Sequence, residues 1–135
     1  MINQQFTFAL HIMTALAFSG KVLDSRTLAV SVNTNPVVVR RLLQSLGRAG
    51  LIETYTGKNG GAKLLKRPDR ISLLDIYVAV NSRPLLAVNQ RKASRHCRVS
   101  CNMKKIITAV AESAEDTVQK HLRGIALTQV VRQVR

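Results

Sequence analysis

The chain has 135 residues, enough for one domain or for one domain with an oligomerisation arm. Its 21 Lys and Arg oppose 7 Asp and Glu, so the formal net charge is +14 and a polyphosphate such as a nucleic acid is the expected partner. No run of eighteen apolar residues is present, so we expect no membrane partner.

Three helices are predicted in the first fifty residues. Apolar residues recur at steps of three and four from about residue 3 to 18, which predicts an amphipathic helix that Ser19-Gly20 ends. Ser25 is the expected N-cap of a short second helix. Asn35 followed by Pro36 is typical of a helix start, so a third helix is predicted from there to about Ala49. Its apolar positions share one side, and they are Val39, Leu42, Leu43 and Leu46.

A β-hairpin is predicted after the third helix. Residues 51–56 alternate as a strand does, the loop at 57–61 reads Gly-Lys-Asn-Gly-Gly, and residues 62–66 return. Two short helices joined by a sharp turn, followed by a glycine-rich hairpin with lysines, are typical of a winged helix-turn-helix. The order therefore predicts a protein that binds double-stranded DNA, with the hairpin as its wing.

The remaining chain is predicted to form a helix, a loop and a long helix. Ser72 is the expected cap of a mostly buried helix that ends near residue 80. Residues 81–101 lose periodicity and gather basic side chains without an acid, which is typical of a mobile loop. After Cys101, apolar residues spaced by four run for about five turns, and they are Ile106, Val110, Ala114, Val118 and Leu122. This stripe needs a second apolar surface, so we expect it to be the interface of a homodimer.

These elements define a fold class and three segments. We expect a mainly α fold with a small β-hairpin, built as a winged helix-turn-helix domain plus a long C-terminal dimerisation helix. Residues 1–80 are the expected winged helix-turn-helix DNA-binding domain, and 81–101 the basic, cysteine-containing sensor loop. Residues 102–135 are the expected dimerisation helix and C-terminal segment, which closes with a short helix or strand.

Candidate DNA contacts lie at the start of the third helix and in the hairpin. The N-terminal residues of a recognition helix lie nearest the base edges, where Arg offers two donors to guanine and Val can touch thymine methyl groups. Wing residues can reach the minor groove or its phosphates. The candidates are Thr34, Asn35, Val37, Val38, Arg40, Arg41, Lys58, Asn59, Lys63 and Lys66, with Arg67 as a further phosphate contact. The alternative for each cation is an ordinary solvated charge.

Three segments resemble the Rrf-two family of bacterial winged-helix transcriptional regulators, the group that includes IscR, NsrR and CymR. They are FALHIMTALAF, LAVSVNTNPVVVRRLLQSLGRAGLIET and GKNGGAKLLKRPDRISLLDIYVAV. The resemblance covers roughly residues 1 to 80 motif by motif. The rest resembles the family only in its order of a cysteine loop followed by a dimerisation helix. It implies a homodimer, a repressor or an activator, that reads an inverted repeat in promoter DNA and senses a signal through the loop before the long helix. We expect a repressor.

The cysteine loop departs from the family members that hold an iron–sulfur cluster. Those members carry three cysteines at six-residue intervals, whereas the segment RKASRHCRVSCNMKK holds only Cys97 and Cys101, four apart. We therefore expect no metal and no cofactor, although a cluster completed by His96 or by a second subunit stays open. The chain resembles instead the cluster-free branch with a loop cysteine.

Both cysteines are candidate redox or electrophile sensors that gate DNA binding. Nearby cations and a helix N-terminus favour the thiolate, which is the form that oxidants attack. A local Cys97–Cys101 bridge on one helical turn is sterically poor, so a mixed disulfide or a bond across the dimer is the expected product. The alternative is that Cys97 and Cys101 are small packing residues without a signalling role.

Two features predict a cytoplasmic protein. Two cysteines are too few for the disulfide framework of a secreted protein, and the N-terminus lacks the basic segment of a signal peptide.

An enzymatic function has no support in the sequence. No paired carboxylates and no nucleophile beside a base are present, and the glycine-rich loop is followed by Ala-Lys rather than by the Lys-Ser/Thr pair of a nucleotide-binding loop. The remaining alternative is a basic interaction protein that binds RNA or an acidic protein partner.

Overall fold

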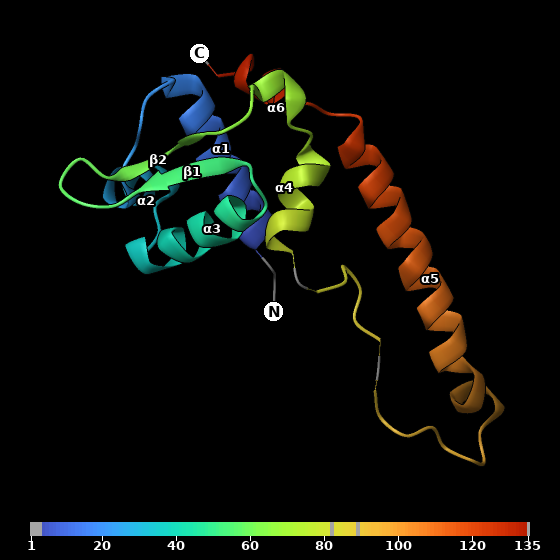
Figure 1. Ribbon diagram of the computed structural model, residues 1–135. Helices are drawn as coiled ribbons and strands as arrows, with labels where there is room; N and C mark the ends of the chain where they lie inside the picture. Colours follow the sequence, from blue (N-terminus) through green and yellow to red (C-terminus); the bar gives the residue numbers. More distant parts are fainter. Residues whose placement is uncertain (1–3, 82, 89, 135) are drawn as a thin grey trace. The chain divides into compact units, whose positions relative to one another are not determined.

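The computed structural model describes residues 4–81, 83–88 and 90–134 (Figure 1). The chain forms two compact units, of which the first holds the residues up to 81 together with those from 122 onward, and the second holds 82–121. The predicted fold class, mainly helical with one small antiparallel hairpin, is confirmed. The sequence predicts the segments 1–80, 81–101 and 102–135, whereas in the structure the residues from 122 onward group with the first unit.

The first unit, called here the winged unit, contains most of the elements. Their order is α1 (Gln5–Ser19), α2 (Ser25–Val32), α3 (Pro36–Arg48), β1 (Ile52–Tyr55), β2 (Gly61–Leu64), the short 3-10 helix η1 (Pro68–Arg70), α4 (Leu73–Val80) and α6 (Leu127–Val131). The predicted helices and strands are therefore present, with ends that differ by a few residues.

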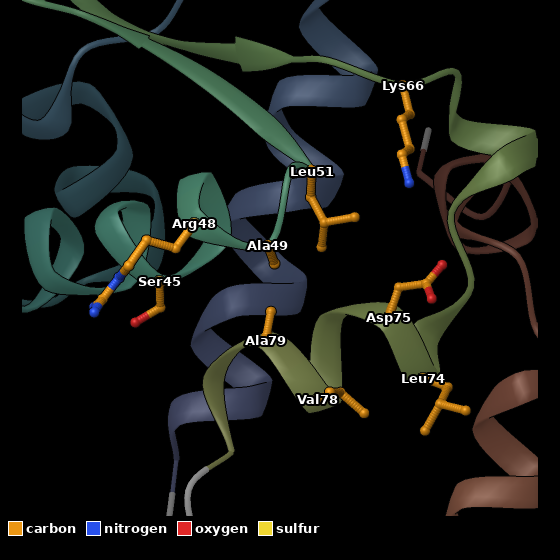
Figure 2. A pocket seen from close by; sticks show the side chains of 9 residues that line it. All are labelled: Ser45, Arg48, Ala49, Leu51, Lys66, Leu74, Asp75, Val78 and Ala79. Carbon is orange, nitrogen blue, oxygen red and sulfur yellow. The ribbon is translucent and has the colours of Figure 1, made fainter.

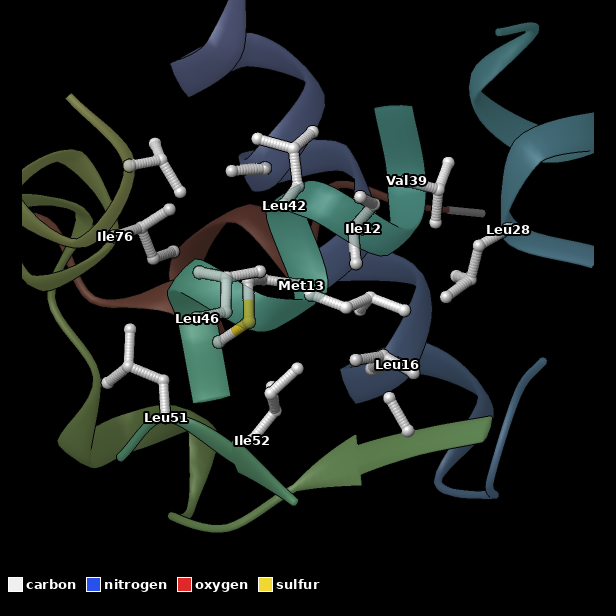
Figure 3. Packing of buried hydrophobic residues seen from close by; sticks show 14 of the residues in the cluster. Ile12, Met13, Leu16, Leu28, Val39, Leu42, Leu46, Leu51, Ile52 and Ile76 are labelled. Carbon is white, nitrogen blue, oxygen red and sulfur yellow. The ribbon is translucent and has the colours of Figure 1, made fainter. Parts of the chain in front are cut away.

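Helix α1 forms the centre of the winged unit. It contacts α2, α3, α4, α6 and β2. Its Ile12 and Met13 are fully buried (Figure 3), and so is Ala9. The sequence predicts an apolar stripe that runs through Phe6, Leu10, Met13 and Ala17. Ile12 lies outside it, because a helix covered by several neighbours needs apolar side chains on more than one side. The buried face of α3 is the predicted one, with Val39, Leu42, Leu43 and Leu46.

Caps fix the starts of the short helices. The carboxylate of Asp24 accepts a hydrogen bond from the Thr27 N–H at 2.6 Å, so Asp24 and not Ser25 is the N-cap of α2. That hydrogen bond favours the charged carboxylate and lowers the pKa of Asp24. Ser72 caps α4 as predicted, through a reciprocal pair of hydrogen bonds with Asp75.

The hairpin is held by a contact that the sequence does not reveal. Strands β1 and β2 pair antiparallel, with Ile52 opposite Leu64 and Tyr55 opposite Gly61. Leu23 adds a short bridge to the outer side of β2 through two hydrogen bonds with Ala62, of 3.0 and 2.9 Å. A Cβ atom on Gly61 would clash with the backbone oxygen of Leu23, so this glycine allows the close approach.

The C-terminal segment packs into the core of the winged unit. Leu73 N–H donates to the Ile125 carbonyl and Leu127 N–H to the Ile71 carbonyl, both at 2.8 Å. The side chain of Leu127 is fully buried, and α6 contacts α1 and η1. Residues 122–134 therefore belong with the winged unit, which corrects their expected grouping with the dimerisation helix.

The second unit is called here the sensor unit, after the role that the sequence predicts for its cysteines. It consists of an extended segment and most of the long helix α5 (Arg98–Arg123). Helix α5 begins before Cys101, whereas the sequence predicts a start after it. Leu85 N–H donates to a carboxylate oxygen of Glu115 at 3.2 Å, which ties the extended segment to α5. Of the residues in α5 only Ala111 is buried. In the described part of the chain, no helix combines the length and the apolar character needed to span a membrane.

Candidate nucleic-acid interface

The turn between α2 and α3 sets the direction of the second helix. Asn33 adopts φ 64°, a left-handed conformation that Asn tolerates better than most residues, and the Thr34 N–H donates to the Ala29 carbonyl at 3.0 Å. The side-chain oxygen of Asn35 then accepts from the Val37 N–H at 2.8 Å and caps α3. Thr34 is half-buried and Asn35 is exposed, both at the positive end of α3.

One face of α3 is exposed along its whole length and is basic. Its residues follow the helical steps i, i+3, i+4, i+7 and i+11, and they are Val37, Arg40, Arg41, Gln44 and Arg48. The opposite face is the buried one, so packing against the core fixes which side chains point outward. Within the described residues neither Arg40 nor Arg41 forms an ion pair with a carboxylate. This exposed face of α3 is therefore free to meet a partner.

Two changes to the predicted set follow from this geometry. Val38 is half-buried and packs against the core of its own unit, so we remove it from the candidate base contacts. Gln44 and Arg48 join the exposed face; the sequence places Gln44 away from the buried side of the helix but includes neither residue among the candidate DNA contacts. Their spacing of seven and eleven residues from Val37 was the signal that could have found them.

The hairpin loop presents two of the predicted wing residues. The loop that joins β1 and β2 projects beyond the two strands (Figure 1). Lys58 and Asn59 lie in the middle of this loop and are exposed. A Cβ atom on Gly60 would lie 2.6 Å from the backbone oxygen of Tyr55, so the loop is too tight there for a side chain. Lys63 lies on β2 opposite Glu53, with its ammonium 5.6 Å from the centre of the Tyr55 ring. A hydrogen bond with the Tyr55 side chain raises the pKa of Lys63.

The last two predicted cations lie at the other end of β2. Lys66 lines a surface pocket together with Arg48 from α3 and Asp75 from α4 (Figure 2). The Arg67 guanidinium forms an ion pair with Asp69 at 2.7 Å. Each therefore has an acidic residue nearby and is separated from the tip of the wing by the length of the strand. We accordingly keep Lys58 and Asn59 as the candidate wing contacts.

The sensor unit holds both cysteines, which are free and exposed. Cys97 precedes the first residue of α5, and its sulfur lies 3.5 Å from the Ser100 N–H, from which it accepts. The thiol of Cys101, within the first turn of the helix, donates to the Ser94 carbonyl at 3.1 Å. Ser94 N–H in turn donates to the Ser100 hydroxyl at 2.8 Å. The two sulfurs thus have opposite hydrogen-bonding roles.

The side chains of the predicted dimerisation stripe are only partly exposed to solvent. Ile106 and Val110 are half exposed, at 50% and 53%, and Ala114 and Val118 are partly covered. Leu122 is also partly buried, but it packs against the core of the winged unit. We therefore remove Leu122 from the predicted interface, which leaves the stripe from Ile106 to Val118.

An exposed basic helix that follows a tight turn, joined to a hairpin with a basic tip, defines the class of winged helix-turn-helix DNA-binding proteins. Comparison with known proteins gives the family. The model of the Rrf2 family, described as an iron-dependent transcriptional regulator, matches residues 2–133. The chain therefore belongs to the Rrf2 family, which is the Rrf-two family of the sequence resemblance, and it is a DNA-binding transcriptional regulator.

Individual relatives agree with this assignment. The chain is similar to YwnA of Bacillus subtilis (strain 168), provisionally named an HTH-type transcriptional regulator, with 33% identity over 97% of each chain. It is also similar to a crystal structure of a protein provisionally described as DNA-binding, with 30% identity, a TM-score of 0.73, and coverage of 93% of this chain and 97% of the other. CymR, the global cysteine regulator of B. subtilis, shares the fold at 19% identity and a TM-score of 0.70, over 100% of this chain and 98% of CymR.

Proposed function

We propose that this regulator is a homodimeric repressor that acts in the cytoplasm and binds an inverted repeat in promoter DNA. The observation that carries the proposal is the exposed face of α3, on which Arg40 and Arg41 project without an ion-pair partner among the described residues. Two guanidinium groups one position apart can read guanine edges, and the neighbouring Val37 can contact a thymine methyl group.

The proposed complex places α3 in the major groove and the wing on the adjacent backbone. The start of α3 would approach the bases, with the exposed amide nitrogen of Asn35 and the hydroxyl of Thr34 near a phosphate at its positive end. Lys58 and Asn59 would reach the minor groove or its phosphates. Two copies related by a two-fold axis would then read two half-sites about 34 Å apart, one helical turn of DNA.

Selection from a random duplex library, followed by gel shifts on the enriched sequences, tests this proposal. The expected result is an inverted repeat that the full chain prefers over random DNA of the same length by a factor of at least about 10³. A structured RNA of equal charge serves as competitor. Enrichment of no sequence, or equal competition by the RNA, would refute the proposal of a specific DNA-binding regulator.

Lys58→Ala is expected to weaken binding to operator and to random DNA by a similar factor. The side chain is exposed at the tip of the wing, where it meets phosphates and carries no base information. The slope of log affinity against log salt concentration should become less steep by about one unit per subunit. Fluorescence anisotropy at several salt concentrations measures both quantities. Lys21→Ala, an exposed lysine outside α3 and the wing, is the control and should leave the slope unchanged.

We propose that the regulator works without an iron–sulfur cluster, although its family is described as iron-dependent. In residues 4–81, 83–88 and 90–134, no three His, Cys, Asp or Glu side chains gather in a group that could hold a metal ion. Cys97 and Cys101 are held in hydrogen bonds with backbone groups instead. The donor set of one subunit therefore does not fit the four ligands that a cluster takes.

Cys97 is the proposed sensor. A sulfur that accepts an N–H hydrogen bond at a helix N-terminus is suited to carry the negative charge of the thiolate. Cys101, whose thiol donates to a carbonyl oxygen, would lose that hydrogen bond on ionising. With hydrogen peroxide, the Cys97 thiolate would take one oxygen to become a sulfenic acid, while the O–O bond breaks and the other oxygen leaves as hydroxide. The new group would displace the Ser100 N–H and alter the start of α5.

Cys97→Ser is expected to abolish the response of DNA binding to peroxide. The wild-type chain should change its operator affinity on oxidation and recover it after reduction, as measured by anisotropy with labelled operator. Cys101→Ser is the matched control, since it lies one helical turn away and should retain the response. If both variants respond like the wild type, the cysteines are packing residues and the redox gate is wrong.

A further inference from the structure

We propose that the winged unit binds a small zwitterion, an α-amino acid with an apolar side chain, in the surface pocket that Lys66 lines. This pocket, called here the α4 pocket, lies between the end of α3, the base of the hairpin and α4 (Figure 2). Its volume is about 640 Å³, which falls within the range of small-molecule sites. The proposal goes beyond the proposed function, because binding of this ligand is measured without DNA.

Two opposite charges face each other across the α4 pocket. Figure 2 shows the Lys66 ammonium and the Asp75 carboxylate pointing toward one another, from the end of the hairpin and from the first turn of α4. In the part of the chain that the structure describes, the ion pairs lie elsewhere, so none joins these two groups. A space therefore remains between a cation and an anion. It matches a ligand that carries a carboxylate and an ammonium group close together, since each can form a charge-assisted hydrogen bond.

The Asp75 carboxylate is already held in one position. Its Oδ2 atom accepts a hydrogen bond from the Ser72 N–H at 2.9 Å, as part of the cap of α4. Its Oδ1 atom accepts no hydrogen bond from another described residue, so it is available to an ammonium group. Such a preorganised acceptor loses little conformational freedom on binding. The exposed Lys66 offers the three donors of its ammonium group to a carboxylate.

The surface between the two charged groups is apolar. The side chain of Leu51 points toward the gap between them (Figure 2). The lining also includes Leu74, Val78 and Ala79 of α4, and the Val78 side chain is 63% exposed. An apolar side chain on the ligand would cover this surface and remove it from water. The pocket therefore favours an apolar amino acid over glycine.

The second cation that lines the pocket does not face the gap. Figure 2 shows the side chain of Arg48 pointing away from Lys66 and Asp75. The gap is therefore bounded by one positive and one negative group. A simple anion would pair with Lys66 but would also lie near the Asp75 carboxylate, which repels it. This balance favours a zwitterion over a carboxylate or a phosphate without an ammonium group.

An NMR titration of the full chain with L-leucine, without DNA, tests the proposal. The backbone amide signals of residues 47–51, 66 and 74–79 should shift and saturate, with a dissociation constant of about 1 mM because the ligand is small and the pocket is open. Isocaproate lacks the ammonium group of leucine, isoamylamine lacks its carboxylate, and glycine lacks its apolar side chain. Each of the three should bind roughly tenfold more weakly or worse, because each loses one of the contacts.

Two substitutions assign the contacts to their residues. Lys66→Gln should bind leucine and isoamylamine equally, because the partner of the ligand carboxylate is gone. Asp75→Asn should bind leucine and isocaproate equally, and its amide oxygen can still accept from the Ser72 N–H. Arg70→Gln is the matched control, since it removes one exposed charge outside the pocket lining and should bind leucine as the wild type does. Circular dichroism melting curves identify a variant that fails to fold, and the ligand series on the wild-type chain needs no substitution.

The outcomes that overturn the proposal are distinct. Absence of a saturable shift at millimolar leucine, or shifts confined to other residues, would overturn binding in the α4 pocket. Isocaproate or isoamylamine that binds the wild-type chain as tightly as leucine would overturn the recognition of a zwitterion. Leucine affinity unchanged by Lys66→Gln would overturn the assigned contact. Failure of the proposed function would instead appear as lost operator preference, with the leucine titration unaffected.

Discussion

Arg40→Ala and Arg41→Ala are each expected to lower the ratio of operator affinity to random-DNA affinity roughly tenfold or more. A bidentate contact between arginine and guanine discriminates by about 1–3 kcal/mol against a wrong base, and both side chains project from the exposed face of α3. Affinity for random DNA should fall much less, because only one positive charge is lost. Competition gel shifts with operator and random duplexes measure the two affinities.

Arg70→Ala is the control for these two variants. It removes an exposed arginine that belongs to η1 rather than to α3, so it changes the net charge equally. The ratio should stay near the wild-type value. If Arg70→Ala lowers the ratio as much as Arg40→Ala, the arginines act through general charge and α3 does not read the bases.

Leu127→Ala is expected to lower the free energy of unfolding of the winged unit by roughly 3 kcal/mol. Leu127 is fully buried although it lies 47 residues after Val80, where α4, the preceding element of that unit, ends. Its N–H donates to the Ile71 carbonyl. Removing three heavy atoms there costs apolar burial and leaves a cavity. Urea denaturation followed by circular dichroism measures the loss, and DNA binding should fall with it at high temperature.

Val134→Ala is the matched control for Leu127. Its side chain is 40% exposed in the same C-terminal segment, so the expected loss is below about 1 kcal/mol. Unchanged stability of Leu127→Ala would show that the C-terminal segment is not part of the cooperative core. Removal of residues 122–135 would then leave a folded winged unit, contrary to the structure.

Helix caps, apolar spacing and turn glycines in the sequence predicted the elements that depend only on neighbouring residues. The start of α3 follows from Asn35 and Pro36, and its buried face follows from one valine and three leucines at helical spacing. The remaining positions of the helix are therefore predicted to be exposed. The hairpin loop follows from the glycines of 57–61 because only they fit its tight backbone. Most of the proposed DNA contacts depend on these two elements.

Contacts between residues that are far apart in the sequence could not be predicted from local sequence patterns. The bridge between Leu23 and Ala62 and the return of Leu127 to the core join segments far apart in the chain, so no local periodicity announces them. Helix α1 is covered on several sides, which blurred its stripe. The sequence places the start of α5 too late because the side chain that caps it is Cys97, a residue that the usual capping preferences do not include.

The sensor unit has a consequence for how such regulators can be rebuilt. The chain leaves the winged unit after residue 81 and re-enters it at residue 122, so the proposed sensor is an insertion with two covalent junctions rather than a tail. To exchange this unit for another one, both junctions must be kept. Truncating the chain after α4 would also remove residues 122–135, which belong to the winged unit and contribute Leu127 to its core. A different signal could thus be attached to the same DNA-reading surface without altering α3 or the wing.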